Sequence, residues 1–564
     1  MNQPRRSVLV SVLVLSLVTP ALARPAPARK QRTTKAADRK KLGAFARVNF
    51  GRELRPTRET IGRRTEPLTA EEETAAQIQK LIRSTLRGGV TGLFVADART
   101  GEPLFSVNGE DPLNPASNVK MISTATSLEL LGSDFRFPTR VLGPAPTNGI
   151  VKGDVYLLGS HDPTLTFNDF DHIATAMAAR HITQLDGNIV VGSDPTRDGI
   201  YRAIVPIEIT AGEPGQPPTA TLPAGSDLVN LKITATTTGR VQRARLTYKT
   251  QLTTTPAGQP RITLTIGGAI GKDGKISYPL WTKQRTATAV YALTAALHAH
   301  SIGVTGELKT MELGEFIGDA ASRGMLPIEL GRHESDTVAG IVMNINKWSI
   351  NWLADRLVMT ASALSRRQVP SMALALESMY GWLDRHPHVA KTNILIDTGS
   401  GLSYRTQISP HELVSIVRSA GGFTGDSDPT SARAWLRSLS IAGTDGTLKN
   451  RFRGSEIRGH IVGKTGTLAT AIALSGVLEI DPQRPLAFAI VTNSDYPLSK
   501  PITRRAHEQV ITAITQYLAK TSSRLAPVPP RIAPSTPTAP TTPPSADDEE
   551  SEPDALDHET ATQR

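Results

Sequence analysis

A serine and a lysine stand three positions apart in the stretch NPASNVK, where Ser117 could be a nucleophile and Lys120 its base. The stretch is typical of a helix start, which would place both side chains on one face and Ser117 at the positive end of the helix. A serine hydroxyl is a weak nucleophile unless a neighbouring base takes its proton. A lysine can be that base only where burial or nearby charge lowers its pKa. Alone, the pair is also what residue frequencies produce by chance.

Two further motifs could complete such a site. Ser349-Ile350-Asn351 supplies a second hydroxyl and an amide, and Lys464-Thr465-Gly466 lies on an expected strand. Lys464 and Thr465 could bind a substrate carboxylate, and Gly466 would let a substrate backbone lie close to the strand. Each motif alone is compatible with a place on the surface. All three in the order SxxK, SxN, KTG are much more specific than any one of them alone.

Asp397 offers a different chemistry, because the stretch ILIDTGSGLS has the form in which an aspartic protease presents a catalytic carboxylate. That mechanism needs two carboxylates that share one proton. The sequence contains no second Asp-Thr-Gly or Asp-Ser-Gly, and one carboxylate per subunit of a homodimer would suit a much shorter chain. We therefore interpret Asp397 as part of a glycine-rich turn after a buried strand.

The elements that must position these residues can be predicted from local signals. A capping pattern at Thr69 precedes a helical run, residues 92–108 alternate like a hairpin, and the helix that starts near Ser117 should end at Gly132. Short β-rich runs dominate from about 140 to 320, and helical patterning follows. We expect a signal peptide (1–23), a basic flexible arm (24–70), a discontinuous catalytic domain (71–140 and 321–524), inserted β-rich domains (141–320) and a disordered Pro-rich acidic tail (525–564).

Composition narrows the function classes. The chain of 564 residues has a formal net charge of +11 and no cysteine, which excludes disulfides, thiolate metal sites and cysteine nucleophiles. No HExxH or phosphate-binding glycine loop occurs. The basic arm has few aromatic residues, so we expect a solvated linker and no nucleic-acid binding.

The first residues indicate export. Arg5 and Arg6 precede a short apolar run that ends near the small-residue site Ala21-Leu22-Ala23, as in a cleaved signal peptide. An uncleaved anchor is the alternative. No second hydrophobic span follows, so we expect no integral membrane domain in the mature chain and a location in the periplasm or cell-envelope space.

Beyond these motifs, the chain resembles the penicillin-recognising serine D,D-peptidases from about residue 75 to 520. Within them it is similar to the D-alanyl-D-alanine carboxypeptidase/endopeptidase group, peptidase family S13, also called class C low-molecular-mass penicillin-binding proteins. The resemblance includes PASNVKMISTATSLELLGSDFRF, GDVYLLGSHDPTLT, DTGSGLSYRTQISPHELV and AGTDGTLKNRFR. It implies an α/β (α+β) transpeptidase-like domain, an antiparallel sheet flanked by helices, with inserted β-rich domains.

The resemblance also implies a serine-type D-Ala-D-Ala carboxypeptidase, with possible D,D-endopeptidase activity on peptidoglycan stem peptides and inhibition by β-lactams. Ser117 would attack, Lys120 would accept its proton, Ser349 would relay a proton and Asn351 would hold Lys120. Lys464 and Thr465 would bind the terminal carboxylate, and the backbone N–H groups of Ser117 and Thr467 would form the oxyanion hole. No metal or organic cofactor is implied, and the oligomeric state stays open.

Three positions depart from the family pattern. Ile350 stands where Asp is common, His161 replaces Gly in the SGDP-like Ser160-His161-Asp162-Pro163, and Asp355 replaces Glu. Asp162 could meet the ammonium group of the stem peptide, or it could only form an Asx-type turn. Two other functions stay open: a catalytically weak wall-binding protein and a β-lactamase.

Overall fold

The computed structural model describes residues 68–521, except 87, 195–198, 201–202, 224–225, 227, 242–243, 255–259, 282–284, 387, 390–393 and 454–455. The expected signal peptide, nearly all of the expected basic arm and the Pro-rich tail therefore lie outside the described residues. Among the described helices, none is both long enough and apolar enough to cross a membrane.

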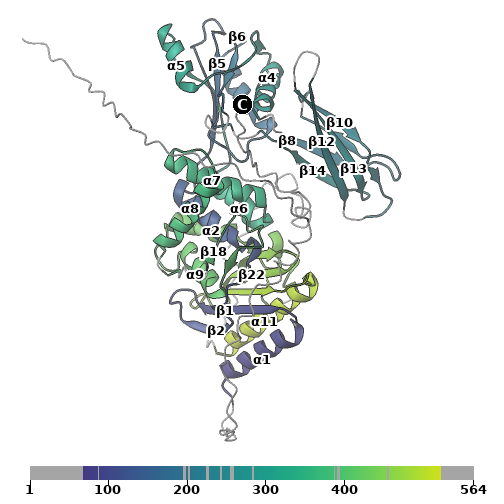
Figure 1. Cartoon of the computed structure of the whole chain (residues 1–564), viewed down its shortest axis with the longest axis vertical. Helices are drawn as coiled ribbons and strands as arrows, with labels where there is room; N and C mark the ends of the chain where they lie inside the picture. Colours follow the sequence, from purple (N-terminus) through teal and green to yellow (C-terminus); the bar gives the residue numbers. More distant parts are fainter. Residues whose placement is uncertain are drawn as a thin grey trace, which may run out of the picture. The chain divides into compact units, whose positions relative to one another are not determined.

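A six-stranded antiparallel sheet forms the centre of the first core, in the order β2-β1-β23-β22-β21-β20 (Figure 1). The expected hairpin and the strand expected at Lys464 are both present. The strands of this sheet are β1 Val90–Asp97, β2 Pro103–Val107, β20 Ser440–Ile441, β21 Ile461–Thr467, β22 Ala471–Leu478 and β23 Leu486–Asn493.

Helices cover both faces of this sheet because its strands are apolar on both sides. On β1, Leu93 and Val95 face a core shared with α1 and α11, whereas Phe94 and Ala96 face a larger helical core. The helices are α1 Ala70–Thr85, α2 Lys120–Leu131, α6 Val338–Trp348, α7 Asn351–Arg366, α8 Met372–Arg385, α9 Pro410–Ala420, α10 Pro429–Ser438 and α11 Lys500–Thr521. Short elements complete this part: the 3-10 turns η1 Ala116–Val119 and η3 Gly446–Leu448, and the pair β18 Ile394–Leu395 and β19 Gln407–Ile408.

A second hydrophobic core contains residues between Val141 and Leu330. Its strands are β3 Pro138–Gly143, β4 Ile150–Lys152, β5 Val155–Leu158, β6 Gln184–Asp186, β7 Ile189–Val191, β8 Val205–Thr210, β9 Thr219–Thr221, β10 Val229–Ile233, β11 Thr236–Thr237, β12 Arg245–Thr254, β13 Pro260–Ile270, β14 Lys275–Leu280, β15 Gly303–Val304, β16 Leu308–Thr310 and β17 Ile328–Glu334. Its helices are η2 Phe167–Asp169, α3 Phe170–Ala179, α4 Arg285–Ala299 and α5 Leu313–Ser322.

The chain enters and leaves this inserted segment through two paired strands. β3 and β17 are antiparallel neighbours in the sheet β16-β7-β5-β3-β17, with Thr139 opposite His333. At the junction the Ser335 amide donates to the Phe137 carbonyl over 3.0 Å. β17 thus lies in the same sheet as β3, β5, β7 and β16.

Candidate active site

The segment that carries Ser117 is held from both sides before α2 begins. The backbone N–H of Asn114 donates a hydrogen bond to Asn493 Oδ1 over 2.7 Å. The side-chain oxygen of Asn114 accepts one from the backbone N–H of Ala116 over 2.8 Å. Ala116 has φ +47°, a left-handed backbone conformation that residues other than glycine rarely adopt. These contacts fix the direction in which the next residue, Ser117, leaves the loop.

Two glycines allow close approach to this segment. A Cβ on Gly401 would lie 2.1 Å from the Ala116 carbonyl oxygen, and a Cβ on Gly466 would lie 2.3 Å from the Pro115 carbonyl oxygen. The sequence suggested that Gly466 makes room for a substrate backbone. The structure gives its missing side chain another role, which is to let strand β21 pack against the loop before Ser117.

Lys120 is fully buried at the first position of α2. Its Nζ lies 3.0 Å from Ser117 Oγ and 2.8 Å from the Ser400 carbonyl oxygen, and it also bonds Asn351 Oδ1. Three oxygen acceptors therefore surround the amine. A neutral amine could keep its two N–H groups on Ser400 and Asn351 and turn its lone pair toward the Ser117 hydroxyl.

Ser349 breaks what the sequence pattern shows as one continuous helical stretch. It ends α6 with φ +61°, and Ile350 is extended, so that α7 starts at Asn351 in a new direction. The break brings the Ser349 hydroxyl to Lys464 Nζ, 2.7 Å away, while Asn351 reaches Lys120. One short turn thus connects both lysines.

Lys464 is fully buried on strand β21. Its Nζ also donates a hydrogen bond to the backbone carbonyl of the next residue, Thr465, over 2.9 Å. Burial, and after it the nearby charge of Lys120, lowers the pKa of Lys464 well below its ordinary value. No carboxylate bonds its Nζ among the described residues. A substrate carboxylate would supply Lys464 with the anionic partner that the described residues do not provide.

The outer part of β21 leaves an edge open among the described strands. β20 pairs only with Val462 and Gly463, so residues 464–467 have a strand partner on the β22 side alone. Thr465 Oγ1 donates to Thr447 Oγ1 over 2.9 Å, and Thr467 Oγ1 accepts from Arg504 over 3.2 Å. An extended peptide could pair with such an edge.

Asp397 has a local structural role. Its carboxylate oxygens accept hydrogen bonds of 2.6 Å from Ser403 and Thr406 within the same loop. The loop also presents the Ser400 carbonyl to Lys120. Asp355 supports it from α7, since its carboxylate bonds the backbone of Gly399 and Ser400, and burial raises the pKa of Asp355 to about 6 despite the charge of Lys120.

Asp162 lies in the loop after β5, in the inserted segment, and this loop contacts the catalytic core. The Thr360 hydroxyl of α7 donates to the His161 carbonyl over 3.2 Å, and His161 has φ +62°. One Asp162 oxygen accepts from the amide and hydroxyl of Thr164 over 2.7 and 2.6 Å, and its Oδ2 is buried with no partner among the described residues. Burial raises the pKa of Asp162 to about 7.

The structure thus brings Ser117, Lys120, Ser349, Asn351 and Lys464 into one connected site, and Asp162 lies outside it. Several members were missed from the sequence. The Ser400 carbonyl carries no side-chain signal, and Thr447 and Arg504 come from η3 and α11, which no motif connects to the KTG strand. For Ser400, the repeated glycines around it were the available signal.

Known proteins resemble this chain over most of its length. Residues 74–199 and 195–517 match the D-Ala-D-Ala carboxypeptidase 3 (S13) family. A D-alanyl-D-alanine carboxypeptidase of an Actinomadura species is 27% identical over 470 residues, which cover 77% of this chain and 82% of the relative. A carboxypeptidase of Mycobacterium tuberculosis is 25% identical over 72% of this chain and 76% of its own length.

Among solved structures, penicillin-binding protein 4 from Haemophilus influenzae, in complex with a β-lactam, superposes with a TM-score of 0.58. The two chains are 17% identical, and the match covers 78% of this chain and 99% of that one. This similarity supports the α/β fold with an antiparallel sheet, flanking helices and additional domains.

Proposed function

Because the chain belongs to the D-Ala-D-Ala carboxypeptidase 3 (S13) family, we propose that Ser117 is the nucleophile of a serine-type D-Ala-D-Ala carboxypeptidase that cleaves peptidoglycan stem peptides. The observation that carries this assignment is the contact between Lys120 Nζ and Ser117 Oγ, 3.0 Å apart and buried beside Asn351. The pair has the geometry that a base-activated hydroxyl requires.

In the acylation step, Ser117 Oγ attacks the carbonyl carbon of the penultimate D-alanine and gives its proton to Lys120. The backbone N–H groups of Ser117 and Thr467 hold the oxyanion, and losing one such donor typically costs about 10²–10³ in rate. The C–N bond breaks, and Ser349 relays a proton to the departing amine. Water then hydrolyses the acyl-serine ester and restores the Ser117 hydroxyl.

Lys464 and Thr465 bind the terminal carboxylate in this proposal, at the edge of β21 where no described strand pairs. A carboxylate beside Lys464 would favour its charged form, which burial alone opposes. Ser349 lies 2.7 Å from Lys464 Nζ, so carboxylate binding and proton relay share one hydrogen-bonded group.

Asp162 is proposed to receive the ammonium group of the stem peptide's diamino acid. Its buried, unpartnered Oδ2 supports this role, because a buried acceptor without a partner is costly unless a ligand supplies one. A D,D-endopeptidase reaction follows the same steps when the leaving amine belongs to a cross-linked peptide. The enzyme would act in the cell envelope after export and removal of residues 1–23.

Intact-protein mass spectrometry after incubation with benzylpenicillin tests the proposal. We expect one persistent penicillin adduct on the wild type, because a β-lactam acylates the nucleophile and cannot leave the site as D-alanine does. Ser117→Ala should give none, and Ser322→Ala, which removes an exposed hydroxyl from α5, serves as the control that keeps the adduct.

The other outcomes separate the rival functions. Drug consumption without a lasting adduct would indicate a β-lactamase. An absence of both adduct and consumption would contradict the enzyme and favour a wall-binding protein. Where the adduct forms, release of D-alanine from a pentapeptide, compared with cleavage of a cross-linked dimer, measures the balance of the two peptidase activities.

A further inference from the structure

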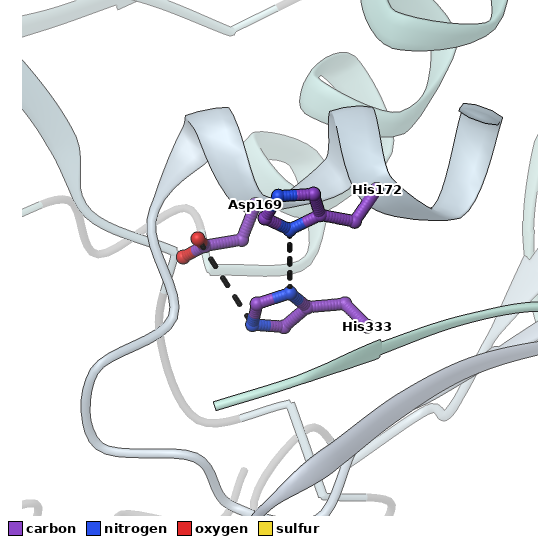
Figure 2. Close-up of side chains that lie close together, drawn as sticks. All are labelled: Asp169, His172 and His333. Carbon is purple, nitrogen blue, oxygen red and sulfur yellow. Dashed lines mark hydrogen bonds and ion pairs between the residues drawn. The ribbon is translucent and has the colours of Figure 1, made fainter. Parts of the chain in front are cut away.

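Three potential metal ligands converge at the start of α3 in the inserted segment. Asp169 is the N-cap residue of α3, His172 follows three positions later on the helix, and His333 comes from the neighbouring strand β17. One ligand atom from each lies within 4.8 Å of the other two. Figure 2 shows the His333 ring between the other two side chains, with one ring nitrogen facing His172 and the other facing Asp169.

The two histidines face each other through ring nitrogens. His172 Nδ1 and His333 Nδ1 are 3.0 Å apart, and His333 turns its other nitrogen to Asp169 Oδ1, 4.0 Å away. Ligand atoms around a tetrahedral zinc ion lie about 3.3 Å apart, as follows from bond lengths of about 2.0–2.1 Å. Since one ligand atom from each residue lies within 4.8 Å of the other two, side-chain rotations would bring the three around one ion, with one nitrogen of His333 as its ligand.

The carboxylate is already held in the orientation that a ligand needs. Asp169 Oδ2 accepts hydrogen bonds from the amide and hydroxyl of Thr166, 2.6 and 2.8 Å away, in the capping box that starts η2. Its Oδ1 is the oxygen that points to His333. Ligating carboxylates in metal sites are commonly fixed by such hydrogen bonds.

The environment of His333 agrees with a metal ligand. The ring is buried, with its Nδ1 against His172 and its Nε2 toward Asp169. His172 is exposed and Asp169 is partly exposed, which gives an ion access from solvent. A direct hydrogen bond between the two rings is the alternative use of the same geometry.

We propose that Asp169, His172 and His333 bind one zinc-class divalent cation, with water at the fourth position. Two imidazoles and one carboxylate suit Zn²⁺ and exclude strong binding of Mg²⁺ or Ca²⁺, which require oxygen ligands. The site is independent of the proposed peptidase chemistry. Sequence motifs missed it, because 161 positions separate His172 from His333.

An ion at this place would connect α3 to β17, the strand by which the chain returns to the catalytic core. β17 ends at Glu334, and α6 starts four residues later at Val338 and leads to Ser349. Binding to the folded chain alone raises its stability by mass action. The cation would therefore stabilise the inserted segment at its exit strand.

Calorimetric titration of the untagged, EDTA-treated full chain with zinc chloride tests the proposal. We expect one site per chain, no comparable heat with magnesium or calcium, and a higher melting temperature with zinc. His172→Ala changes an exposed ligand and should weaken zinc binding at least about tenfold without preventing folding. Asp169→Asn keeps an acceptor for Thr166 but removes the ligand's charge, and should weaken binding as well.

His300→Asn is the matched control. His300 lies in the same inserted segment, and its Nε2 is 2.8 Å from Oδ1 of Asp171, the residue before His172. His300 is not part of the cluster. Zinc binding should survive this change. Retention of full affinity in His172→Ala, loss of it in His300→Asn, or no stoichiometric binding to the wild type would each overturn the proposed site.

Discussion

At the scale of single residues, the two buried lysines of the site differ in their surroundings. Lys120 has three oxygen acceptors, and deprotonation would change only its contact with Ser117, since Ser400 and Asn351 can keep the remaining N–H groups. Lys464 contacts one hydroxyl and one carbonyl, and burial opposes its charge. These contacts suit Lys120 as a proton acceptor and Lys464 as a partner for a substrate carboxylate.

Replacing Asp162 by asparagine should increase stability at neutral pH and reduce activity on a stem peptide with a free side-chain amine. Burial raises its pKa to about 7, from an ordinary value near 3.8 in the unfolded chain. Between these pH values the unfolded chain releases a proton that the folded chain retains, so this group makes stability fall as pH rises from about 4 to 7. Asp162→Asn cannot titrate. Its melting temperature relative to wild type should therefore increase across that window.

The same substitution removes the proposed acceptor for the substrate ammonium. Hydrogen bonds to charged groups contribute about 1.5–3 kcal/mol, so kcat/KM for a stem peptide with a free side-chain amine should fall at least about tenfold. A peptide with that amine acetylated is the control and should lose little. Equal losses for both peptides would mean that Asp162 acts on the loop and not on the ammonium.

At the scale of elements, local signals predicted some boundaries and missed others. Thr69 and Glu72 form the expected capping box, and α2 ends before Gly132 as expected. The break at Ser349 was not predictable, because serine does not favour positive φ and the apolar pattern continues across it. That conformation is accompanied by the tertiary contact with Lys464, which no local pattern contains.

Close packing of the Asp397 loop against the nucleophile segment gives a test at this scale. Gly401 has φ +76°, and an added Cβ would lie 2.1 Å from the Ala116 carbonyl oxygen; Gly132 has φ +82° with nothing within 4 Å. Alanine at either position meets a backbone cost of about 1–3 kcal/mol, because both glycines have positive φ. Only Gly401→Ala must also displace the residue before Ser117.

We therefore expect benzylpenicillin acylation to slow by about 10²-fold in Gly401→Ala, since small misplacements of reacting groups can cost that much. Gly132→Ala should lose stability but acylate at nearly the wild-type rate. Stopped acylation time courses followed by mass spectrometry measure both. Similar rates in the two variants would contradict a positioning role for the Gly401 contact.

Helix α11 is connected to the sheet through buried polar groups. His507 Nε2 is hydrogen-bonded to Thr492 Oγ1 over 2.8 Å, and the Thr492 hydroxyl is hydrogen-bonded to the Thr91 hydroxyl over 2.9 Å. These two hydrogen bonds connect α11, β23 and β1. Burial, and after it the charge of Arg451, lowers the pKa of His507 to about 3. Below about pH 6.5 the unfolded chain gains a proton that the folded chain refuses, so this group reduces stability as pH falls toward 3.

His507→Gln should flatten this acid dependence, because the amide can replace the contact to Thr492 without titrating. The unfolding free energy of wild type should decline relative to the variant by up to about 1.4 kcal/mol per pH unit below pH 6.5. Urea unfolding at pH 7.5, 5.5 and 4.5 measures the difference. His411→Gln, at a histidine whose side chain is 40% exposed, is the matched control. Parallel pH profiles of wild type and His507→Gln would contradict the expectation.

At the scale of the whole molecule, the assignment of strands to domains depends on strand pairing as well as on local sequence patterns. Turn-rich β patterning predicted the inserted segment. β17 is connected to that segment by its pairing with β3, by its contact with α3 and by Leu330, which lies in the inserted core. The Asp169, His172 and His333 cluster likewise depends on that pairing. We infer that residues 71–140 and 321–524 form the catalytic domain around the inserted one, with β17 assigned to the insertion.

Separate cores predict separate unfolding. One core contains residues between Val141 and Leu330, and the cores on the two faces of the catalytic sheet contain the elements before and after it. Domains with their own cores commonly unfold as units. We therefore expect two transitions in scanning calorimetry, and acylation by benzylpenicillin should raise only the transition of the catalytic part.

Two matched core substitutions assign the transitions. Leu264 lies in the inserted core and Leu357 in the helical catalytic core, and both are 0% exposed. Leucine-to-alanine changes at such positions cost about 2–5 kcal/mol. Each variant should lower one transition, and a different one, while Leu264→Ala keeps the shift caused by benzylpenicillin. If both variants lower a single shared transition, the two parts unfold as one cooperative unit, and the inserted segment supports the active site as part of that unit.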